Sequence, residues 1–111
     1  MVNMLDVNSI PIDSEETEKT AEMLKALGHP VRLKVIQHLL TQQCCCCGEL
    51  CQCFDYSQST ISQHLGVLKD AGVLSACRDG TRMLYSIDPG AFAHLKHVFS
   101  EFGTKAELIK K

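Results

Sequence analysis

Hydrophobic residues recur at three- and four-residue intervals along the N-terminal two thirds of the chain, a spacing typical of helices with one buried face. The pattern predicts helices over residues 14–27, 30–43 and 57–71, with a short helix over 44–54. Ser14 is the expected N-cap of the first helix, and Pro30 suits the first turn of the second. The residues expected to face the core are Thr17, Ala21, Leu24, Leu27, Leu33, Ile36, Leu39, Leu40, Ile61, Leu65 and Leu68.

The helix over 57–71 has a second face made of short polar side chains. Asp55 and Ser57 are candidate N-caps, and Gly72 lies where a helix commonly ends in a left-handed cap. Hydroxyl and amide groups on one helix face are the types that contact phosphates and base edges in a major groove. A solvated helix face has a similar composition, so the neighbouring elements decide between the two interpretations. The candidate DNA-binding residues of this helix are Ser57, Gln58, Ser59, Thr60, Ser62, Gln63 and His64.

After Gly72 the pattern changes to the alternation of β-strands. Residues 73–78 and 83–87 read as two strands, and the Asp-Gly pair at 79–80 is a strong hairpin signal. Arg78 and Arg82 would flank the hairpin tip, where cations can contact a phosphate backbone or enter a minor groove. Two helices joined by a tight turn and followed by a hairpin predict a winged helix-turn-helix. The predicted fold is mainly α with a β-hairpin wing: four helices, two strands and a last helix.

The last predicted helix, from residue 89 to about residue 109, carries more aromatic side chains than so small a core needs. Its apolar stripe consists of Phe92, Leu95, Val98, Phe99 and Phe102. We interpret this stripe as half of a homodimer interface, formed with or without the first helix. Residues 14–111 are therefore predicted to form one DNA-binding and dimerisation domain, with residues 1–13 as a flexible tail.

A second metal site is a further candidate on the last helix, where Asp88, His94, His97 and Glu101 occur together. His94 and His97 are three residues apart on the helix, but no coordinating residue follows Asp88 directly, so a solvated face is the favoured interpretation.

Composition limits the class of protein without pointing to nucleic acid. The 111-residue chain has a net charge of −2, but residues 1–22 carry −5 and residues 23–111 carry +3. No apolar run approaches the roughly 18 residues of a membrane span, and the start of the chain lacks the pattern of a secretory signal. These features predict a cytoplasmic protein without a membrane partner, whose thiols stay reduced. No catalytic constellation is visible, so an enzyme is not predicted.

Six of the seven cysteines lie between residues 44 and 53. Core packing cannot use so many adjacent thiols, and thiolates select soft or borderline ions such as Cu(I) and Zn(II). By the same logic they suit trivalent arsenic and antimony, which take three sulfurs. If the segment were helical, Cys44, Cys47 and Cys51 would line one face. A redox or persulfide switch is the competing use. Cys77, in the first wing strand, is expected to be a small core residue.

Four segments together resemble one family of bacterial regulators. They read LKALGHPVRLKVIQHLL, GELCQC, SQSTISQHLGVLKDAGVL and RDGTRMLYSID, and the similarity covers about residues 18–88. These segments are similar to the ArsR/SmtB, or arsenic-repressor, family of winged-helix proteins. The resemblance implies a dimeric repressor that binds double-stranded operator DNA through residues 57–64. It also implies that an ion or an oxidant releases the DNA.

The resemblance also implies a sensing site ahead of the DNA-reading helix. Family members that sense arsenicals or heavy metals show Glu-Leu-Cys-Val-Cys-Asp-Leu, whose first cysteine falls at Cys46. The second cysteine position is Gly48, and a third thiol in some members falls at Cys51. Cys47 is the expected substitute for the missing thiol, with Cys45 and Cys53 as alternatives. The expected metal ligands are therefore Cys46, Cys47, Cys51 and Cys45.

The expected inducer is As(III) or Sb(III), with Zn, Cd, Pb or Cu(I) as further candidates. Two alternatives remain at this stage. The chain could be a repressor that responds to thiol oxidation or persulfides, or a thiol-rich metal-binding protein without a regulatory role.

Overall fold

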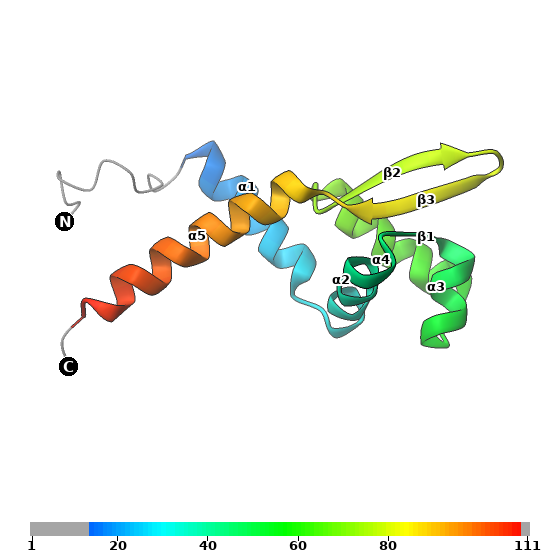
Figure 1. Cartoon of the computed structure of the whole chain (residues 1–111), viewed down its shortest axis with the longest axis horizontal. Helices are drawn as coiled ribbons and strands as arrows, with labels where there is room; N and C mark the ends of the chain where they lie inside the picture. Colours follow the sequence, from blue (N-terminus) through cyan, green and yellow to red (C-terminus); the bar gives the residue numbers. More distant parts are fainter. Residues whose placement is uncertain (1–13, 110–111) are drawn as a thin grey trace.

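The computed structural model describes residues 14–109, which form five helices and a three-stranded antiparallel sheet (Figure 1). The predicted tail, residues 1–13, lies outside the described residues. The winged helix-turn-helix is confirmed, with one strand more than predicted. The elements are α1 Glu15–Leu27, α2 Pro30–Gln42, β1 Cys44–Cys46, α3 Cys47–Phe54, α4 Gln58–Asp70, β2 Leu74–Asp79, β3 Arg82–Ile87 and α5 Pro89–Glu107.

The helix boundaries follow from local capping, as the sequence predicts. Ser14 accepts a hydrogen bond from the Thr17 amide at the start of α1, and Pro30 occupies the first turn of α2. Gly72 makes the turn after α4 with φ +82°, a backbone conformation that residues with a side chain rarely adopt. Gly80, with φ +64°, allows the tight turn between the two long strands.

The predicted buried faces of the first two helices need correction. In α1 the buried residues are Thr20, Met23 and Ala26, whereas Thr17 and Ala21 are exposed. In α2, the predicted core residues Ile36 and Leu39 are buried, but Leu33 and Leu40 are 47% and 61% exposed, and Val31 and Val35 take their places in the core. Both helices contain apolar residues on more than one side. The spacing of apolar residues alone therefore does not predict which side packs against the core.

The segment 44–54 is not one helix. Gln43, with φ 69°, ends α2 and turns the chain into strand β1. β1 pairs antiparallel with β3, opposite Leu84–Ser86, so the sheet order is β1-β3-β2. The face predicted to join Cys44 to Cys47 and Cys51 is therefore wrong, because Cys44 lies in the strand. The cysteine run instead joins the wing sheet to α3.

One apolar core fixes α3 and α4 against the rest of the chain. The side chains with almost no solvent exposure include Val35 and Leu39 of α2, Leu50 of α3, Ile61, Leu65 and Leu68 of α4, and Val73. The N-terminal half of α5 packs on this body through Ala91 and Leu95, and its C-terminal half projects away from it (Figure 1). No helix within residues 14–109 is both long and apolar enough to cross a membrane.

Candidate DNA interface and cysteine site

The turn between α3 and α4 holds the start of α4 in a fixed position. Asp55 is the C-cap of α3 in the left-handed conformation, with φ 54°. Ser57 is the N-cap of α4, and its Oγ accepts a hydrogen bond of 3.2 Å from the Thr60 amide. The same hydroxyl donates to Thr60 Oγ1 at 2.8 Å. Of the two candidate N-caps, Ser57 therefore caps α4, whereas Asp55 ends α3.

The polar face of α4 is open to solvent at most of the predicted positions. Thr60 and His64 are half-buried, and the other five candidates are exposed, namely Ser57, Gln58, Ser59, Ser62 and Gln63. No acidic residue occurs in α4 before Asp70. An exposed, acid-free face of amides and hydroxyls can approach a phosphate backbone without charge repulsion.

His64 turns its ring toward α2. Arg32 Nη1 lies 3.3 Å from His64 Nδ1, and the rings of His29 and His64 have centroids 4.6 Å apart. Burial, followed by the charges of His29 and Arg32, lowers the pKa of the His64 imidazole. His64 is thus placed to position α4 against the start of α2, a role that the sequence alone did not indicate.

This environment predicts a stability that falls in mild acid. Because the folded-state pKa of His64 is lowered, the unfolded chain binds a proton more readily once the pH falls through about 6.5. We expect His64→Gln to reduce the loss of melting temperature between pH 7.5 and pH 5.5, measured by circular dichroism. His97→Gln, on the exposed side of α5, is the matched control. Equal losses in His64→Gln and wild type would contradict this interpretation.

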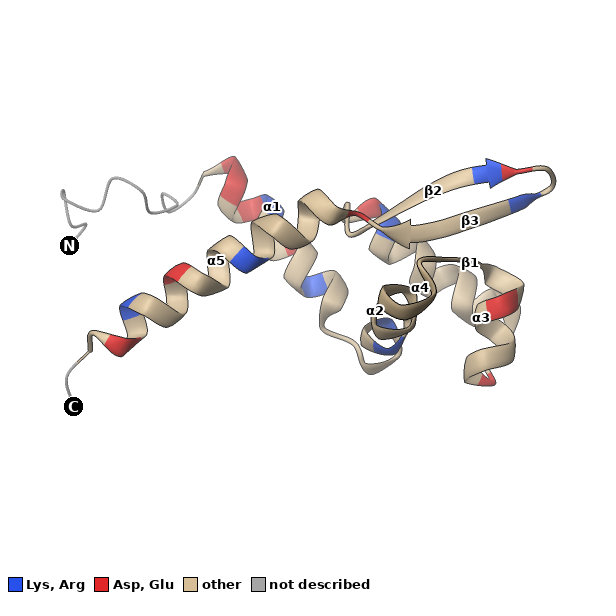
Figure 2. Cartoon of the chain, in the orientation of Figure 1, with Lys and Arg blue, Asp and Glu red and all other residues tan. Residues whose placement is uncertain are grey.

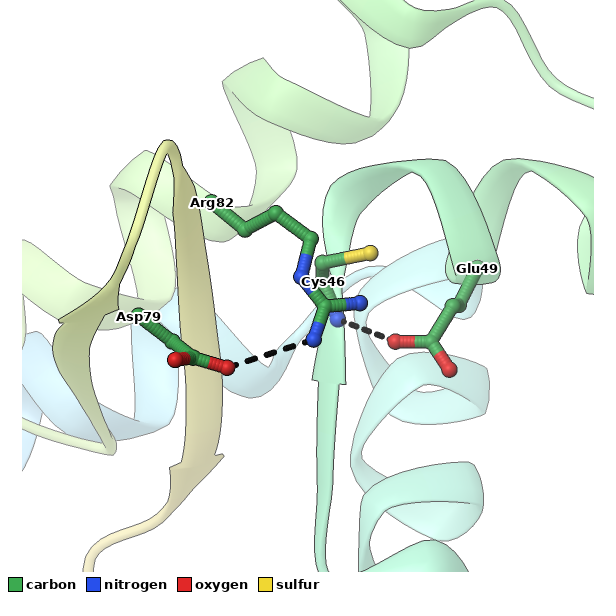
Figure 3. A network of polar contacts seen from close by, with 4 residues as sticks. All are labelled: Cys46, Glu49, Asp79 and Arg82. Atoms are coloured by element: carbon green, nitrogen blue, oxygen red, sulfur yellow. Dashed lines mark hydrogen bonds and ion pairs between the residues drawn. The ribbon is translucent and has the colours of Figure 1, made fainter.

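The wing tip carries two exposed arginines, as predicted. Arg78 and Arg82 lie near the tip of the β2–β3 hairpin (Figure 2). Arg82 forms an ion pair of 3.3 Å with Asp79 across the turn. That hydrogen bond, together with the nearby Cys46 thiol, raises the pKa of Arg82. Figure 3 shows Arg82 lying between Asp79 and the start of α3, where the Cys46 amide donates to Glu49 at 2.9 Å. The wing cation therefore adjoins the cysteine segment.

Three of the predicted metal ligands gather at the start of α3. Cys46 is the N-cap, Cys47 is the first helical residue, and Cys51 follows one turn later. Burial, and then the neighbouring Cys51, raises the pKa of the Cys47 thiol to about 11. The Cys47 Sγ donates to the backbone carbonyl of Gln58 at 3.7 Å. The Cys47 thiol thus contacts the first residue of α4.

The remaining cysteines lie elsewhere. Cys45 is buried in β1, and burial, followed by the charge of Glu49, raises the pKa of its thiol. Cys44 and Cys53 are exposed. Cys77 is also exposed, so its predicted core role is wrong: Leu74 takes the buried position of strand β2. Within residues 14–109, no three His, Cys, Asp or Glu side chains are arranged to hold a metal ion. Binding of an ion by three thiols therefore requires some movement.

The polar residues of α5 contact both α1 and one another. His94 Nε2 lies 2.7 Å from Thr20 Oγ1 of α1, and His97 lies 3.9 Å from Glu101 one turn along. The favoured interpretation of a solvated face therefore fits the exposed His97 but is wrong for His94, which is half-buried against α1. Phe99 and Phe102 are 52% and 59% exposed, whereas Leu95 and Val98 are buried, so only the C-terminal part of the predicted stripe is uncovered in the single chain.

Comparison with known proteins agrees with this architecture. A family model described as a helix-turn-helix domain matches residues 27–75. The HTH-type transcriptional regulator YgaV of Escherichia coli is 38% identical over 74% of this chain and 87% of its own length.

The HTH-type transcriptional repressor SmtB of Mycobacterium tuberculosis is 36% identical over 79% of this chain and 62% of its own length. A solved structure named as a possible transcriptional regulator for arsenical resistance is 30% identical, with a TM-score of 0.66 over 80% of this chain and 98% of that one. The matched regions include the helix-turn-helix that carries the exposed polar face of α4. The chain therefore belongs to the ArsR/SmtB family of helix-turn-helix transcriptional regulators.

Proposed function

We propose that this regulator is a dimeric repressor that binds operator DNA through α4 and the wing. We further propose that it leaves the DNA when As(III) or Sb(III) binds Cys46, Cys47 and Cys51. The observation that carries this proposal is the contact of the Cys47 thiol with the Gln58 carbonyl. It links the cysteine cluster directly to the helix that would read the DNA. Cys45 is left out of the proposed ligand set because its thiol is buried in β1.

Ion binding changes this contact in a defined way. Arsenite, As(OH)₃, reacts with three thiols to give three As–S bonds, and the thiol protons leave with the hydroxides as three water molecules. Cys47 then has no S–H to donate, and the Gln58 carbonyl loses that partner. Cys46 must also move toward Cys51, which disturbs both the N-cap of α3 and the surroundings of Arg82. Both changes reach elements that would contact DNA.

The ion can shift the equilibrium only through its different affinity for the free and the DNA-bound protein. A coupling free energy of about 1–3 kcal/mol corresponds to about 5- to 150-fold weaker DNA binding. By reciprocity, operator DNA weakens arsenite binding by the same factor.

Fluorescence anisotropy on the promoter DNA of the protein's own gene tests the proposal. We expect arsenite and antimonite to raise the Kd for the operator. The other compounds to be tested are Zn(II), Cd(II), Pb(II), Cu(I), peroxide and polysulfide. Release by peroxide or polysulfide, but not by metalloids, would favour a redox or persulfide switch instead. Absence of any salt-sensitive DNA binding would favour a thiol-rich metal-binding protein without a regulatory role.

The exposed amide of Gln63 should contribute to operator specificity. Gln63→Ala is expected to weaken operator binding by about 1–3 kcal/mol, because an amide can make two hydrogen bonds to an adenine edge. Binding to unrelated DNA should change much less. Equal losses on both DNAs would mean that Gln63 contacts only the phosphate backbone. Ser100→Ala, on the exposed surface of α5, is the matched control.

A further inference from the structure

A thiol and an imidazole face each other between α2 and α3, outside the proposed arsenite site. The Sγ of Cys53 lies 3.7 Å from Nε2 of His38. The His38 ring also makes an edge contact with Phe54, with ring centroids 5.6 Å apart and an interplanar angle of 77°. This contact orients the imidazole at the end of α2 toward the C-terminal half of α3. Cys53 is exposed, so an ion in solution can reach the pair.

The spacing of these two atoms fits two ligands of one tetrahedral ion. Zinc binds thiolate sulfur at about 2.3 Å and imidazole nitrogen at about 2.0–2.1 Å, which places the two ligand atoms about 3.6 Å apart at a tetrahedral angle. The observed separation of 3.7 Å differs little from that value. An ion could therefore enter between Cys53 and His38 without a change in the backbone.

A carboxylate lies on the same side of α3 as Cys53. Glu49 lies one turn before Cys53 on α3, so both side chains are on one side of that helix. The charge of His38 contributes to the lowered pKa of Glu49, after the hydrogen bonds that its carboxylate accepts from Cys46. Helices α2 and α3 thus bring an imidazole and a thiol together, with a carboxylate on the same side of α3.

We propose that Cys53 and His38 are the first two ligands of a second metal site, which takes a borderline divalent ion of the zinc type and clips α2 to α3. Rotation of the Glu49 side chain, or bound water, completes the coordination, because no three such groups within residues 14–109 converge before an ion binds. The mixed sulfur and nitrogen donors select against arsenite, which takes sulfur. The site therefore goes beyond the proposed arsenite response and does not depend on it.

The experiment uses the full chain with Cys46→Ser, Cys47→Ser and Cys51→Ser combined, which removes the proposed arsenite ligands. Co(II) serves as the optical probe and Zn(II) as the competing ion. We expect one Co(II) per chain, with a thiolate-to-metal charge-transfer band that Zn(II) removes. Adding Cys53→Ser should abolish the band, and adding His38→Gln should weaken Zn(II) binding by at least about 10-fold. Cys77→Ser, a distant exposed thiol, should change neither.

A second measurement keeps the test decisive if the triple variant folds poorly. Zn(II) should raise the melting temperature of the wild-type chain, because an ion that binds only the folded state stabilises it. Cys53→Ser and His38→Gln should each reduce this increase, whereas Cys77→Ser should not.

Zn(II) affinity and stabilisation that are unchanged by both Cys53→Ser and His38→Gln would overturn the second site. Failure of arsenite to release DNA would overturn the proposed function and leave these results unaffected. The two proposals are therefore distinguishable.

Discussion

Cys51→Ser should leave operator binding intact and abolish its release by arsenite. In the wild type, we expect saturating arsenite to raise the Kd for the operator by about 5- to 150-fold. In the variant the change should be less than about 2-fold. Serine is close in size to cysteine, and Cys51 is one of the three thiols that gather at the start of α3. The variant therefore keeps the helix but loses one of three soft ligands.

Cys77→Ser is the control for Cys51→Ser, since Cys77 is an exposed thiol on β2 that lies outside the proposed ligand set and is separated from Cys46 by strand β3. It should respond to arsenite as the wild type does. A Cys51→Ser variant that still releases DNA with the wild-type arsenite dependence would show that the ligand set is wrong.

Gly48 offers a gain-of-function version of the same test. The related sensing motif has a cysteine at this position, and a Cβ built at Gly48 would lie 4.0 Å from the Cys46 Sγ. No other atom would lie as close to that Cβ, and the backbone at Gly48 does not have a positive φ. A side chain can therefore be accommodated at this position. Cys47→Ser should lose the arsenite response, and Gly48→Cys in that background should restore it. Failure to restore it would argue that Cys47 acts through its contact with Gln58 as well as through its sulfur.

The sequence predicted the helix-turn-helix well because its signals are local. Ser57 and Gly72 mark the ends of α4, and the apolar residues Ile61, Leu65 and Leu68 are all buried. The Asp79-Gly80 pair likewise marks the hairpin, whose turn the structure places at Gly80-Thr81. Each of these signals depends on residues within a few positions, so no information about distant contacts was needed.

Strand β1 was missed because its formation depends on a distant partner. Cys44, Cys45 and Cys46 have no apolar–polar alternation, and the strand exists through pairing with β3, about forty residues later (Cys45 opposite Tyr85). The consequence for the site is large. Cys44 leaves the predicted helix face, Cys45 becomes buried, and Cys46 becomes the N-cap of α3. Adjacent, identical residues thus acquire three different environments from one strand pairing.

The contacts between helices could not be predicted for the same reason. Spacing within α2 places Arg32 and His38 on the helix surface, but it does not say which neighbour each of them faces. That depends on how α2 packs on α3 and α4. Once packed, Arg32 meets His64 and His38 meets Cys53. The sequence contains both histidines, but nothing near them in the chain indicates those partners.

Replacement of Phe99 and Phe102 by glutamate should produce a monomer that binds operator DNA at least about 100-fold more weakly than the wild type. Two linked DNA-binding modules gain about 10²–10⁴-fold over one, and a monomer loses that gain. The phenylalanine rings contact each other edge to face, with centroids 6.1 Å apart, yet both are more than half exposed. The radius of gyration of 16.9 Å also exceeds the roughly 13 Å of a compact chain of this length. Both observations favour a second copy covering the C-terminal half of α5.

Phe99→Glu/Phe102→Glu is the test variant, with Lys105→Glu as a control for added negative charge on α5. Sedimentation equilibrium gives the oligomeric state, and anisotropy gives binding to a full operator and to a half-site. The double variant should bind the half-site as the wild-type monomer does, because α4 and the wing are unchanged and lie apart from the exposed end of α5 (Figure 1). If it remained a dimer with full operator affinity, the two copies would have to meet elsewhere, and the exposed Leu33 and Leu40 of α2 would become the next surface to test.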